Sequence, residues 1–464
     1  MLQARHLPFP LACALLAAST VSCVRERSLL PPPVPAARTF SGEGAAVAPD
    51  SWWTAFHSDE LNSLIARALA SSLDLGIAWE RFREAGAIVD RERSALFPDV
   101  DGFLEGRSER GGSGFRSGQD RIEMGLAASY ELDLWGRIES AVEANRFREE
   151  ATQADYEAAQ LSIAAEVAVT WLRLVEGRAR RDLLRRQVVT NEKVLEQLEN
   201  RFDVGDSRSV DVLRQEQLVS ATRQLIPAEE SRIGVLENRL AVLLGNPAQN
   251  GVDFASRALP SLPALPDTGV PGDLVQRRPD VRAALHRVEA ANADVAAAIS
   301  DQFPRITLSG SLLTEGGGAE RLFDNWARSF AANLVTPLLD AGQRRAEVRR
   351  SEAVERRAVY AYGQAILVSF QEVEDALLQE RKQGEVIREL RLRIDLAEKT
   401  YDQLFVEYTN GVSDFIDLLT ALADLQALRR DLLEAERLRL EFRVSLYRAL
   451  AGGIVTRTKG MPDS

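Results

Sequence analysis

The most constraining feature of the sequence is a long helical seam that occurs twice. In the first copy, apolar residues and one asparagine recur at alternating steps of four and three: Leu184, Val188, Asn191, Leu195, Leu198 and Phe202. This roughly 3.5-residue period supercoils helices left-handed around a neighbour, so it predicts a coiled coil. A single helix over about residues 138–202 would be about 95 Å long at ~1.5 Å per residue. Such a helix spans a distance rather than enclosing a core.

The second copy follows at a constant offset of 206 residues. Its seam is Leu390, Ile394, Ala397, Tyr401, Leu404 and Tyr408. The same offset relates four pairs of landmarks: Phe97 and Phe303, Gly136 and Gly342, Gly205 and Gly411, Asp211 and Asp417. A single offset over such a stretch indicates duplication without net insertion. A length of 464 residues would otherwise suggest two or three domains, but the tandem halves indicate one body with internal pseudo-symmetry.

Before each long helix the hydrophobic period changes from helical to two. One face of the predicted strand carries Ile122, Met124, Leu126, Ala128, Tyr130, Leu132 and Leu134, and the other face is small or polar. A tilted strand of this length can cross a bilayer. Together with weaker neighbouring strands, the pattern predicts β-hairpins at about 99–134 and 304–337, the first with a flexible loop at 110–114. Four strands cannot close a barrel and an open edge cannot face lipid, so several chains must pool their strands if these span a membrane.

After each β-hairpin we expect a helical hairpin, at about 137–244 and about 341–450. Gly205 and Gly411 are predicted to end the first helix of each hairpin as left-handed C-caps. Pro227 lies within a predicted helix, where it should kink or interrupt the chain. Pro337 is expected to end the last strand.

The N-terminus has the features of an export signal over residues 1–22, with Arg5 before a short apolar run. Small residues directly before Cys23 resemble a bacterial lipobox, in which the cysteine is acylated; the alternative is plain signal cleavage. Cys13, the other cysteine, lies inside the signal, so no intrachain disulfide is expected in the mature chain.

The remaining segments complete the predicted organisation. Residues 23–51 are rich in proline, alanine and glycine and read as a lipid-anchored tether. The two repeats cover residues 52–246 and 272–453, with a crossing linker at 247–271 and a C-terminal tail at 454–464. Asp59 is a candidate N-cap for the first amphipathic helix.

Composition argues against several classes of function. The formal charge of −12 gives no basic face for nucleic acid. His57 and His286 are the only histidines after the signal, and no cysteine or histidine cluster has the sequence spacing of metal ligands. The carboxylates alternate with arginine and lysine along helices, which is typical of solvated faces. We therefore expect no enzyme, no catalytic residue, no cofactor and no metal site.

The motifs in this order resemble the TolC-like outer membrane efflux proteins of the lipid-anchored type found in tripartite pumps. The resemblance extends from Trp52 to Gly452 and rests on Phe97-Pro98, residues 130–136 (YELDLWG), 276–280 (QRRPD), 336–342 (TPLLDAG) and the glycine-containing helical turns. It implies a homotrimer in which a 12-stranded barrel, four strands per chain, continues into a long α-helical coiled-coil tube across the periplasm.

The resemblance also implies a function and partners. It implies a passive conduit in the outer membrane of a Gram-negative bacterium for the export of small molecules. The implied partners are a periplasmic adaptor and an inner-membrane transporter, of the proton-driven RND type. Two alternatives are an exit duct for polypeptides in type I secretion and a soluble or periplasmic coiled-coil scaffold, which would not explain the hairpins or the export signal.

The candidate functional residues gather at the turns of the helical hairpins. Asp211 and Asp417 lie six residues beyond the glycines, and Asp206 and Asp414 add carboxylates nearby. The resemblance implies a closing lock between Tyr408 and Asp211, although Ser413 replaces the arginine that joins it in some relatives, and it implies adaptor contact at Gly205 and Gly411. The alternatives are that Tyr408, like Phe202, fills the coiled coil, and that the aspartates only favour helix starts.

Overall fold

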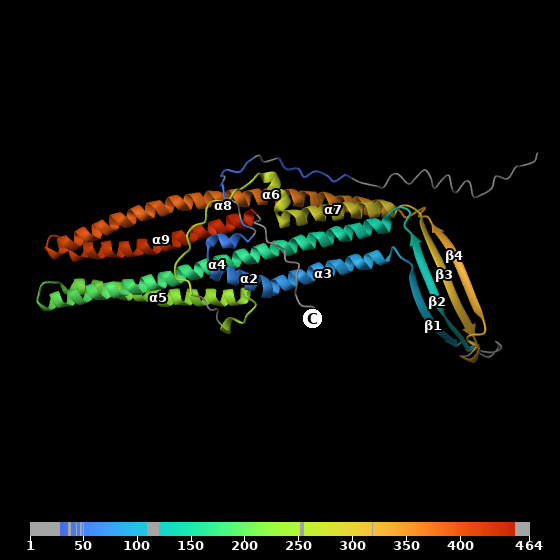
Figure 1. Ribbon diagram of the computed structural model, residues 1–464, viewed down its shortest axis with the longest axis horizontal. Coiled ribbons are helices and arrows are strands. Elements are labelled where there is room, and N and C mark those ends of the chain that lie inside the picture. The colour runs from blue at the N-terminus through green and yellow to red at the C-terminus, as the bar shows by residue number, and fades with distance from the viewer. Residues whose placement is uncertain are drawn as a thin grey trace, which may run out of the picture. The chain divides into compact units, whose positions relative to one another are not determined.

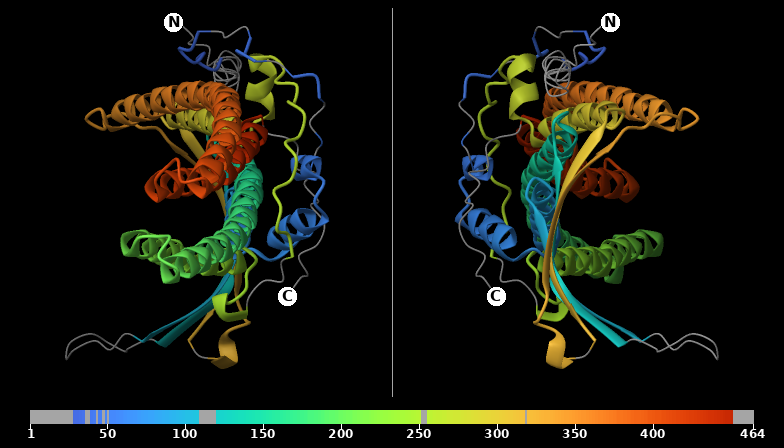
Figure 2. Two further views of the ribbon diagram at one scale, coloured as in Figure 1. Left: turned by 90° about the vertical axis from the view of Figure 1, so that its left-hand side faces the viewer. Right: turned by 90° about the vertical axis from the view of Figure 1, so that its right-hand side faces the viewer.

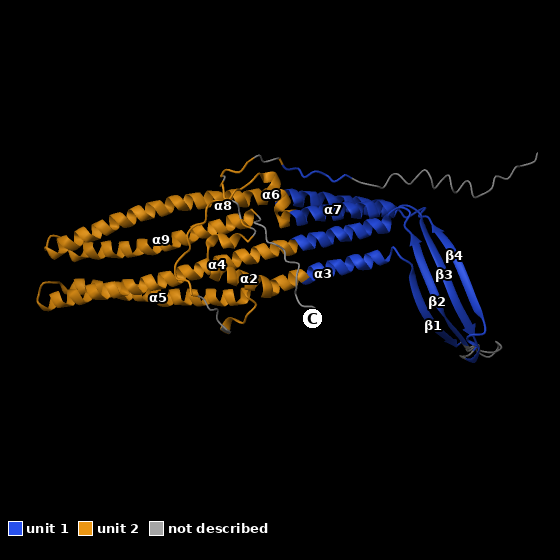
Figure 3. Cartoon of the chain, in the orientation of Figure 1, with its two compact units in different colours: residues 1–34, 80–154, 282–365 blue, residues 35–79, 155–281, 366–464 orange. Residues whose placement is uncertain are grey.

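The protein is described by a computed structural model over residues 28–35, 39–42, 44–46, 49, 51–108, 120–250, 255–317 and 319–450. The signal, Cys23, the loop at 110–114 and the tail at 454–464 lie outside the described residues. The chain divides into two compact units, residues 1–34, 80–154 and 282–365 in unit 1 and residues 35–79, 155–281 and 366–464 in unit 2 (Figure 3). Each unit draws on both halves of the sequence, so the units are not the repeats.

Three helices of each half have the same length and follow at the offset of the sequence repeat (Figure 1). The first half contains η1 (Trp52–Phe56), α2 (Asp59–Ser71), α3 (Leu73–Ser94), α4 (Arg137–Asp203), α5 (Ser209–Leu243) and η2 (Ala248–Asn250). The second half contains α6 (Pro271–Arg277), α7 (Pro279–Ser300), η3 (Ala319–Arg321), α8 (Gln343–Thr409) and α9 (Phe415–Ala449). Both bounds of α7, α8 and α9 lie 206 residues after those of α3, α4 and α5. The predicted long helices are therefore found, 67 residues each in α4 and α8.

Unit 1 contains one antiparallel sheet in the order β1-β2-β3-β4. Its strands are β1 (Asp99–Ser108), β2 (Asp120–Leu132), β3 (Arg305–Gly316) and β4 (Trp326–Val335). The two hairpins join through β2 and β3, where Tyr130 lies opposite Leu308. Among the described residues, no further strand pairs with the outer edge of β1 or β4, and β4 is exposed along its whole length. The sheet thus keeps two open edges within one chain.

The sequence landmarks before the long helices meet one another in unit 1. The Trp135 ring stacks on Phe303 at a centroid distance of 5.0 Å, and its indole N–H donates to the Pro304 carbonyl at 2.6 Å. Gly136 and Gly342 have φ of 71° and 87°, a left-handed backbone that favours glycine at both strand-to-helix changes. The repeated motifs therefore fix how the strands of each half lead into the helices.

The largest apolar core lies in unit 2. It combines η1, α2 and the ends of α5 and α9 with the stretch of α4 from Leu161 to Val175, and Trp52 stacks on Tyr447 at 5.7 Å. By length and composition α4 could span a membrane, but 67% of its most apolar window is buried within the protein. This stretch is therefore a core element. Seen end-on in Figure 2, the α4–α5 and α8–α9 hairpins form two separate antiparallel pairs.

Three local predictions need correction. Ser58, not Asp59, caps α2, because its extended backbone lets Oγ accept the Leu61 N–H at 3.2 Å. Helix α5 continues through Pro227, since buried side chains on both sides of the proline hold the helix in its packing, so the predicted interruption is wrong; a kink at this proline stays a prediction. Phe202 is 45% exposed and does not fill the seam, because it lies in the last turn of α4, directly before the glycine cap.

The crossing linker is held by a buried ion pair in unit 2. Arg443 is 2% exposed and donates to both carboxylate oxygens of Glu380, at 2.7 and 2.6 Å. It also donates to the carbonyl of Ala264 at 2.7 Å. A bridge between Ala46 and Pro266 then places the tether beside the linker. One arginine of α9 thus joins α8 to the segment between the repeats.

We predict that Arg443→Met destabilises the protein by about 3–5 kcal/mol, because Glu380 would be left buried without a partner. Arg429→Met is the matched control: it removes another ion pair between α9 and α8, with Glu398, whose side chains are 46% and 44% exposed. This exposed pair should contribute at most about 1 kcal/mol. The measurement is chemical unfolding of the folded protein in detergent, and equal losses in both variants would contradict the prediction.

Candidate aperture at the helical hairpin tips

The two hairpin turns have the same backbone geometry. Gly205 and Gly411 have φ of 79° and 74°, which confirms the predicted left-handed caps. In the first turn the Gly205 N–H donates to the Phe202 carbonyl at 2.9 Å and the Asp206 N–H to the Arg201 carbonyl at 2.8 Å. The second turn repeats both bonds, which together form a Schellman motif. A Cβ at either glycine would meet open space, so the requirement for glycine is conformational.

Asp211 is the most enclosed of the candidate carboxylates, and arginines hold it. It is 3% exposed and accepts from Arg208 Nε at 3.0 Å, with Arg214 at 3.6 Å. Arg208 also reaches Asp414 of the other repeat at 3.3 Å. The hydrogen bond to Asp211, with the charges of Asp211 and Asp414, raises the pKa of Arg208. Arg208 therefore bridges the two hairpin tips.

Tyr408 takes part through its ring. It packs edge-on against Phe415 at 5.5 Å, and the Arg201 guanidinium lies 4.9 Å from its ring centroid. Its hydroxyl has no hydrogen bond to another described residue. In this structure Arg208, and not the Tyr408 hydroxyl, binds the Asp211 carboxylate, so the lock is not formed here and its role in closing the aperture stays a prediction.

The remaining aspartates differ in their surroundings. Asp206 pairs with Arg201 at 2.8 Å, so this arginine joins the first turn to the Tyr408 ring. Asp417 is exposed in the first turn of α9 and makes no ion pair with the described part of the chain. Asp211 and Asp414 therefore share Arg208 as a partner, whereas Asp417 does not contact this arginine.

The sequence analysis did not identify Arg208 or Arg201 as residues of this site. Arg208 lies three residues before Asp211, a spacing typical of ion pairs on a helix, and the 206-residue offset makes it the counterpart of Asp414. Opposite charges at equivalent positions of the two repeats were the available signal.

An apolar groove of about 380 Å³ lies behind the tips, between α4, α8 and α9. Its lining includes Leu198, Tyr401, Phe405, Tyr408, Phe415 and Leu418. Leu198, Phe415 and Leu418 form a small core beneath it. Tyr408 therefore has a packing role besides any role in gating.

A buried polar layer follows the groove. Asn191, a predicted seam residue, is fully buried and exchanges amide hydrogen bonds with Gln426 of α9, at 2.7 and 3.3 Å. Gln215 of α5 donates to the Asn191 backbone carbonyl at 2.7 Å. A buried asparagine at a seam position fixes the register of coiled coils. The layer thus aligns α4, α5 and α9 so that the charged residues at the tips can meet.

A family model described as "Outer membrane efflux protein" matches residues 64–246 and 270–452. The chain belongs to this family. The two matched segments correspond to the two repeats, and the members' names and structures establish an outer membrane component of an efflux system. The alternative of a soluble coiled-coil scaffold is therefore wrong.

Curated relatives and solved structures also support membership in this family. The chain is 30% identical over 422 residues to the pyoverdine export outer membrane protein OpmQ of Pseudomonas aeruginosa, covering 88% of this chain and 89% of the relative. It is also 30% identical to the solvent efflux pump outer membrane protein SrpC of Pseudomonas putida, covering 86% of each. Among solved structures, the outer-membrane channel OprN is 28% identical with a TM-score of 0.86, covering 93% of this chain and all of that one.

If the hairpin tips form an aperture of this efflux protein, Arg208→Gln should raise single-channel conductance, because the bridge from Asp211 to Asp414 is lost. A hydrogen bond to a charged group contributes about 1.5–3 kcal/mol, which corresponds to a shift of about 10- to 150-fold in the equilibrium from closed to open. Arg223→Gln, which removes the exposed Arg223–Glu192 pair in the same hairpin, is the control and should leave conductance unchanged.

The predicted lock loses one partner in Asp211→Ala and the other in Tyr408→Phe, so each variant should raise conductance in the same assay. Removal of the Asp417 charge should weaken block by multivalent cations. Tyr408→Phe keeps the ring contacts with Phe415 and Arg201 and removes only the hydroxyl. Unchanged conductance and block in folded Arg208, Asp211, Tyr408 and Asp417 variants would show that these residues only maintain structure.

Proposed function

We propose that three copies of this chain form one passive conduit across the outer membrane. The observation that carries the proposal is the four-stranded sheet whose β1 and β4 edges lack partners in the described chain. Unpaired backbone groups cannot face lipid, so the edges must pair between copies. Three copies supply twelve strands, a number within the range of bacterial barrels. The α4–α5 and α8–α9 hairpins of the copies then form the coiled-coil tube in the periplasm.

The hairpin tips are proposed as the contact for a periplasmic adaptor, at the Gly205 and Gly411 turns. The hydroxyls of Ser207 and Ser413, equivalent residues beside these glycines, are buried without a hydrogen-bond partner in the described chain. A buried hydroxyl without a partner costs free energy, so docking of an adaptor that rearranges the turns and gives each hydroxyl a hydrogen bond would be favoured. An inner-membrane transporter, of the proton-driven RND type, completes the proposed pump.

The proposed cargo is small molecules. Relatives are named for export of pyoverdine, for solvent efflux and for toluene efflux. These names favour small organic molecules over the polypeptides of a type I secretion duct. The transporter that loads the conduit would select the cargo, because the chain itself supplies a passage.

The N-terminal anchor completes the proposal. Acylation of Cys23 would attach the tether to the outer membrane. The described part of the tether contacts α8. Val34 lies within 3.1 Å of a Cβ placed on Gly363 of α8, so the tether packs closely on this helix. One acyl chain adds modest affinity beside a membrane-spanning barrel.

Native mass measurement in detergent should give a trimer as the folded species. The physical reason is that one or two copies leave sheet edges open. A folded monomer or dimer as the sole species would contradict the proposed conduit.

Replacing Cys23→Ser should abolish labelling of the chain by a lipid precursor, while insertion of the barrel continues. Cys13→Ser is the matched control, because Cys13 lies inside the predicted signal and should not affect labelling. Undiminished labelling of the Cys23 variant would show that the lipobox interpretation is wrong.

A further inference from the structure

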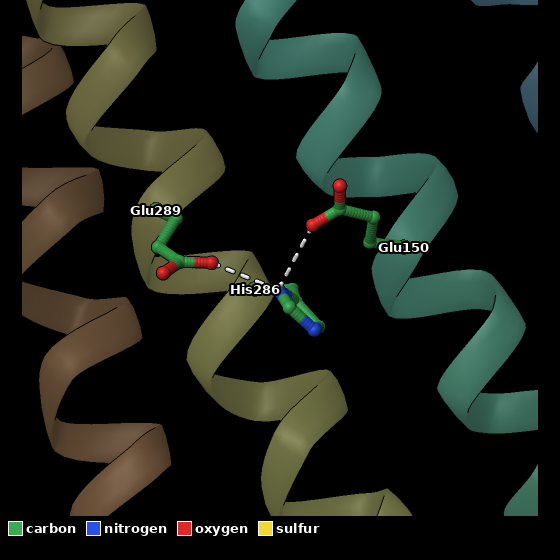
Figure 4. Close-up of side chains that lie close together, drawn as sticks. All are labelled: Glu150, His286 and Glu289. Carbon is green, nitrogen blue, oxygen red and sulfur yellow. Dashed lines mark hydrogen bonds and ion pairs between the residues drawn. The ribbon is translucent and has the colours of Figure 1, made fainter.

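Unit 1 contains a cluster of one histidine and two glutamates that no step of the proposed transport uses. His286 and Glu289 lie one turn apart on α7, and Glu150 comes from α4 (Figure 4). His286 Nδ1 lies 2.8 Å from Glu289 Oε2 and 3.4 Å from Glu150 Oε2. Both carboxylates therefore point to the same ring nitrogen.

A hydrogen bond accounts for only one of these contacts. Nδ1 carries at most one proton, which is directed well to a single acceptor. The 2.8 Å contact with Glu289 suits that bond, whereas 3.4 Å leaves Glu150 without a good one. A cation between the three atoms would instead attract all of them.

The spacing fits the ligands of a small divalent ion. The three ligand atoms lie within 4.8 Å of one another, and no other group of three such residues in the described chain meets this condition. Bonds of about 2.0–2.2 Å in a tetrahedron place neighbouring ligand atoms about 3.3 Å apart. Small rotations of the two glutamates would bring the three separations, which are 2.8 Å, 3.4 Å and at most 4.8 Å, close to this value.

Charge and access also suit a cation. With neutral imidazole the cluster carries two negative charges, and Arg146 lies 3.3 Å from the other oxygen of Glu150. The side chains of His286, Glu150 and Glu289 are 25%, 33% and 22% exposed, so an ion and its water can enter. Burial raises the pKa of the nearby Tyr362, and the charge of Glu289 adds to this effect.

We propose that Glu150, His286 and Glu289 form a site for a divalent transition metal ion of the zinc class, with one position left for water. Imidazole and carboxylate are ligands that zinc and cobalt accept in proteins. The ion would join α4 to α7 within unit 1. The proposal is independent of the proposed transport function.

The test is binding of cobalt(II) and zinc(II) to the detergent-purified full chain, produced without a polyhistidine tag. Cobalt should give the intense visible absorption of a tetrahedral site, and zinc should displace it at one equivalent per chain. Zinc should also raise the thermal unfolding temperature. His286→Ala and the isosteric Glu289→Gln and Glu150→Gln should each weaken binding at least tenfold.

His57→Ala is the matched control, because His57 is the other histidine in the described residues and belongs to no such group. It should bind like the unchanged protein. Binding that persists in the folded His286 and glutamate variants, or the absence of saturable binding in the unchanged protein, would overturn the proposal.

Discussion

The structure depends on one requirement, which is that every backbone N–H and C=O within lipid must have a partner. A sheet of four strands satisfies this requirement for β2 and β3 and leaves one side of β1 and of β4 unpaired. In water such edges can pair with other chains and cause aggregation. In a membrane their unpaired backbone groups cost too much free energy unless another strand covers them. Strand β4 is exposed along its whole length, and among the described strands it pairs only with β3. A channel made by pooling strands is the direct consequence.

The duplication gives the two helical hairpins of the chain matching lengths and similar surfaces. Each half supplies a strand pair, a 67-residue helix and a 35-residue return helix at the same offset, so the two halves present similar surfaces. Two of the differences between the halves place polar residues that join the hairpins. Asn191 corresponds to Ala397, and Arg208 corresponds to Asp414. Arg208 and Asp414 are thus complementary partners at equivalent positions, and Asn191 pairs with Gln426 of α9, so both differences favour contacts between the two hairpins of one chain.

Much of the fold could be predicted from sequence because its signals are local or periodic. The 3.5-residue seam, the two-residue alternation and the constant offset gave the long helices, the strands and the glycine caps within a few residues. Errors arose where local rules competed with packing. Pro227 is a helix breaker by its covalent structure, but buried neighbours such as Val219 and Ile233 keep α5 continuous.

The candidate site was less predictable, because its contacts join residues far apart in sequence. Asp211, Asp414 and Tyr408 were identifiable from their positions near the turns, but the bridging role of Arg208 depends on how two hairpins approach. Likewise, His286 and Glu289 share a helix face that spacing reveals, whereas Glu150 precedes them by more than 130 residues. No sequence-spacing rule for metal ligands finds a partner from another helix whose register is unknown.

The most direct test of the account is residue-resolved hydrogen exchange of the sheet amides in the assembled protein. In β1 and β4, alternate amides face away from the sheet, and no other strand of the described chain pairs with them. If neighbouring copies cover these edges, the outward amides of β1 and β4 will exchange as slowly as the paired amides between β2 and β3. Rapid exchange confined to the outward amides, with β2 and β3 protected, would contradict edge-to-edge assembly.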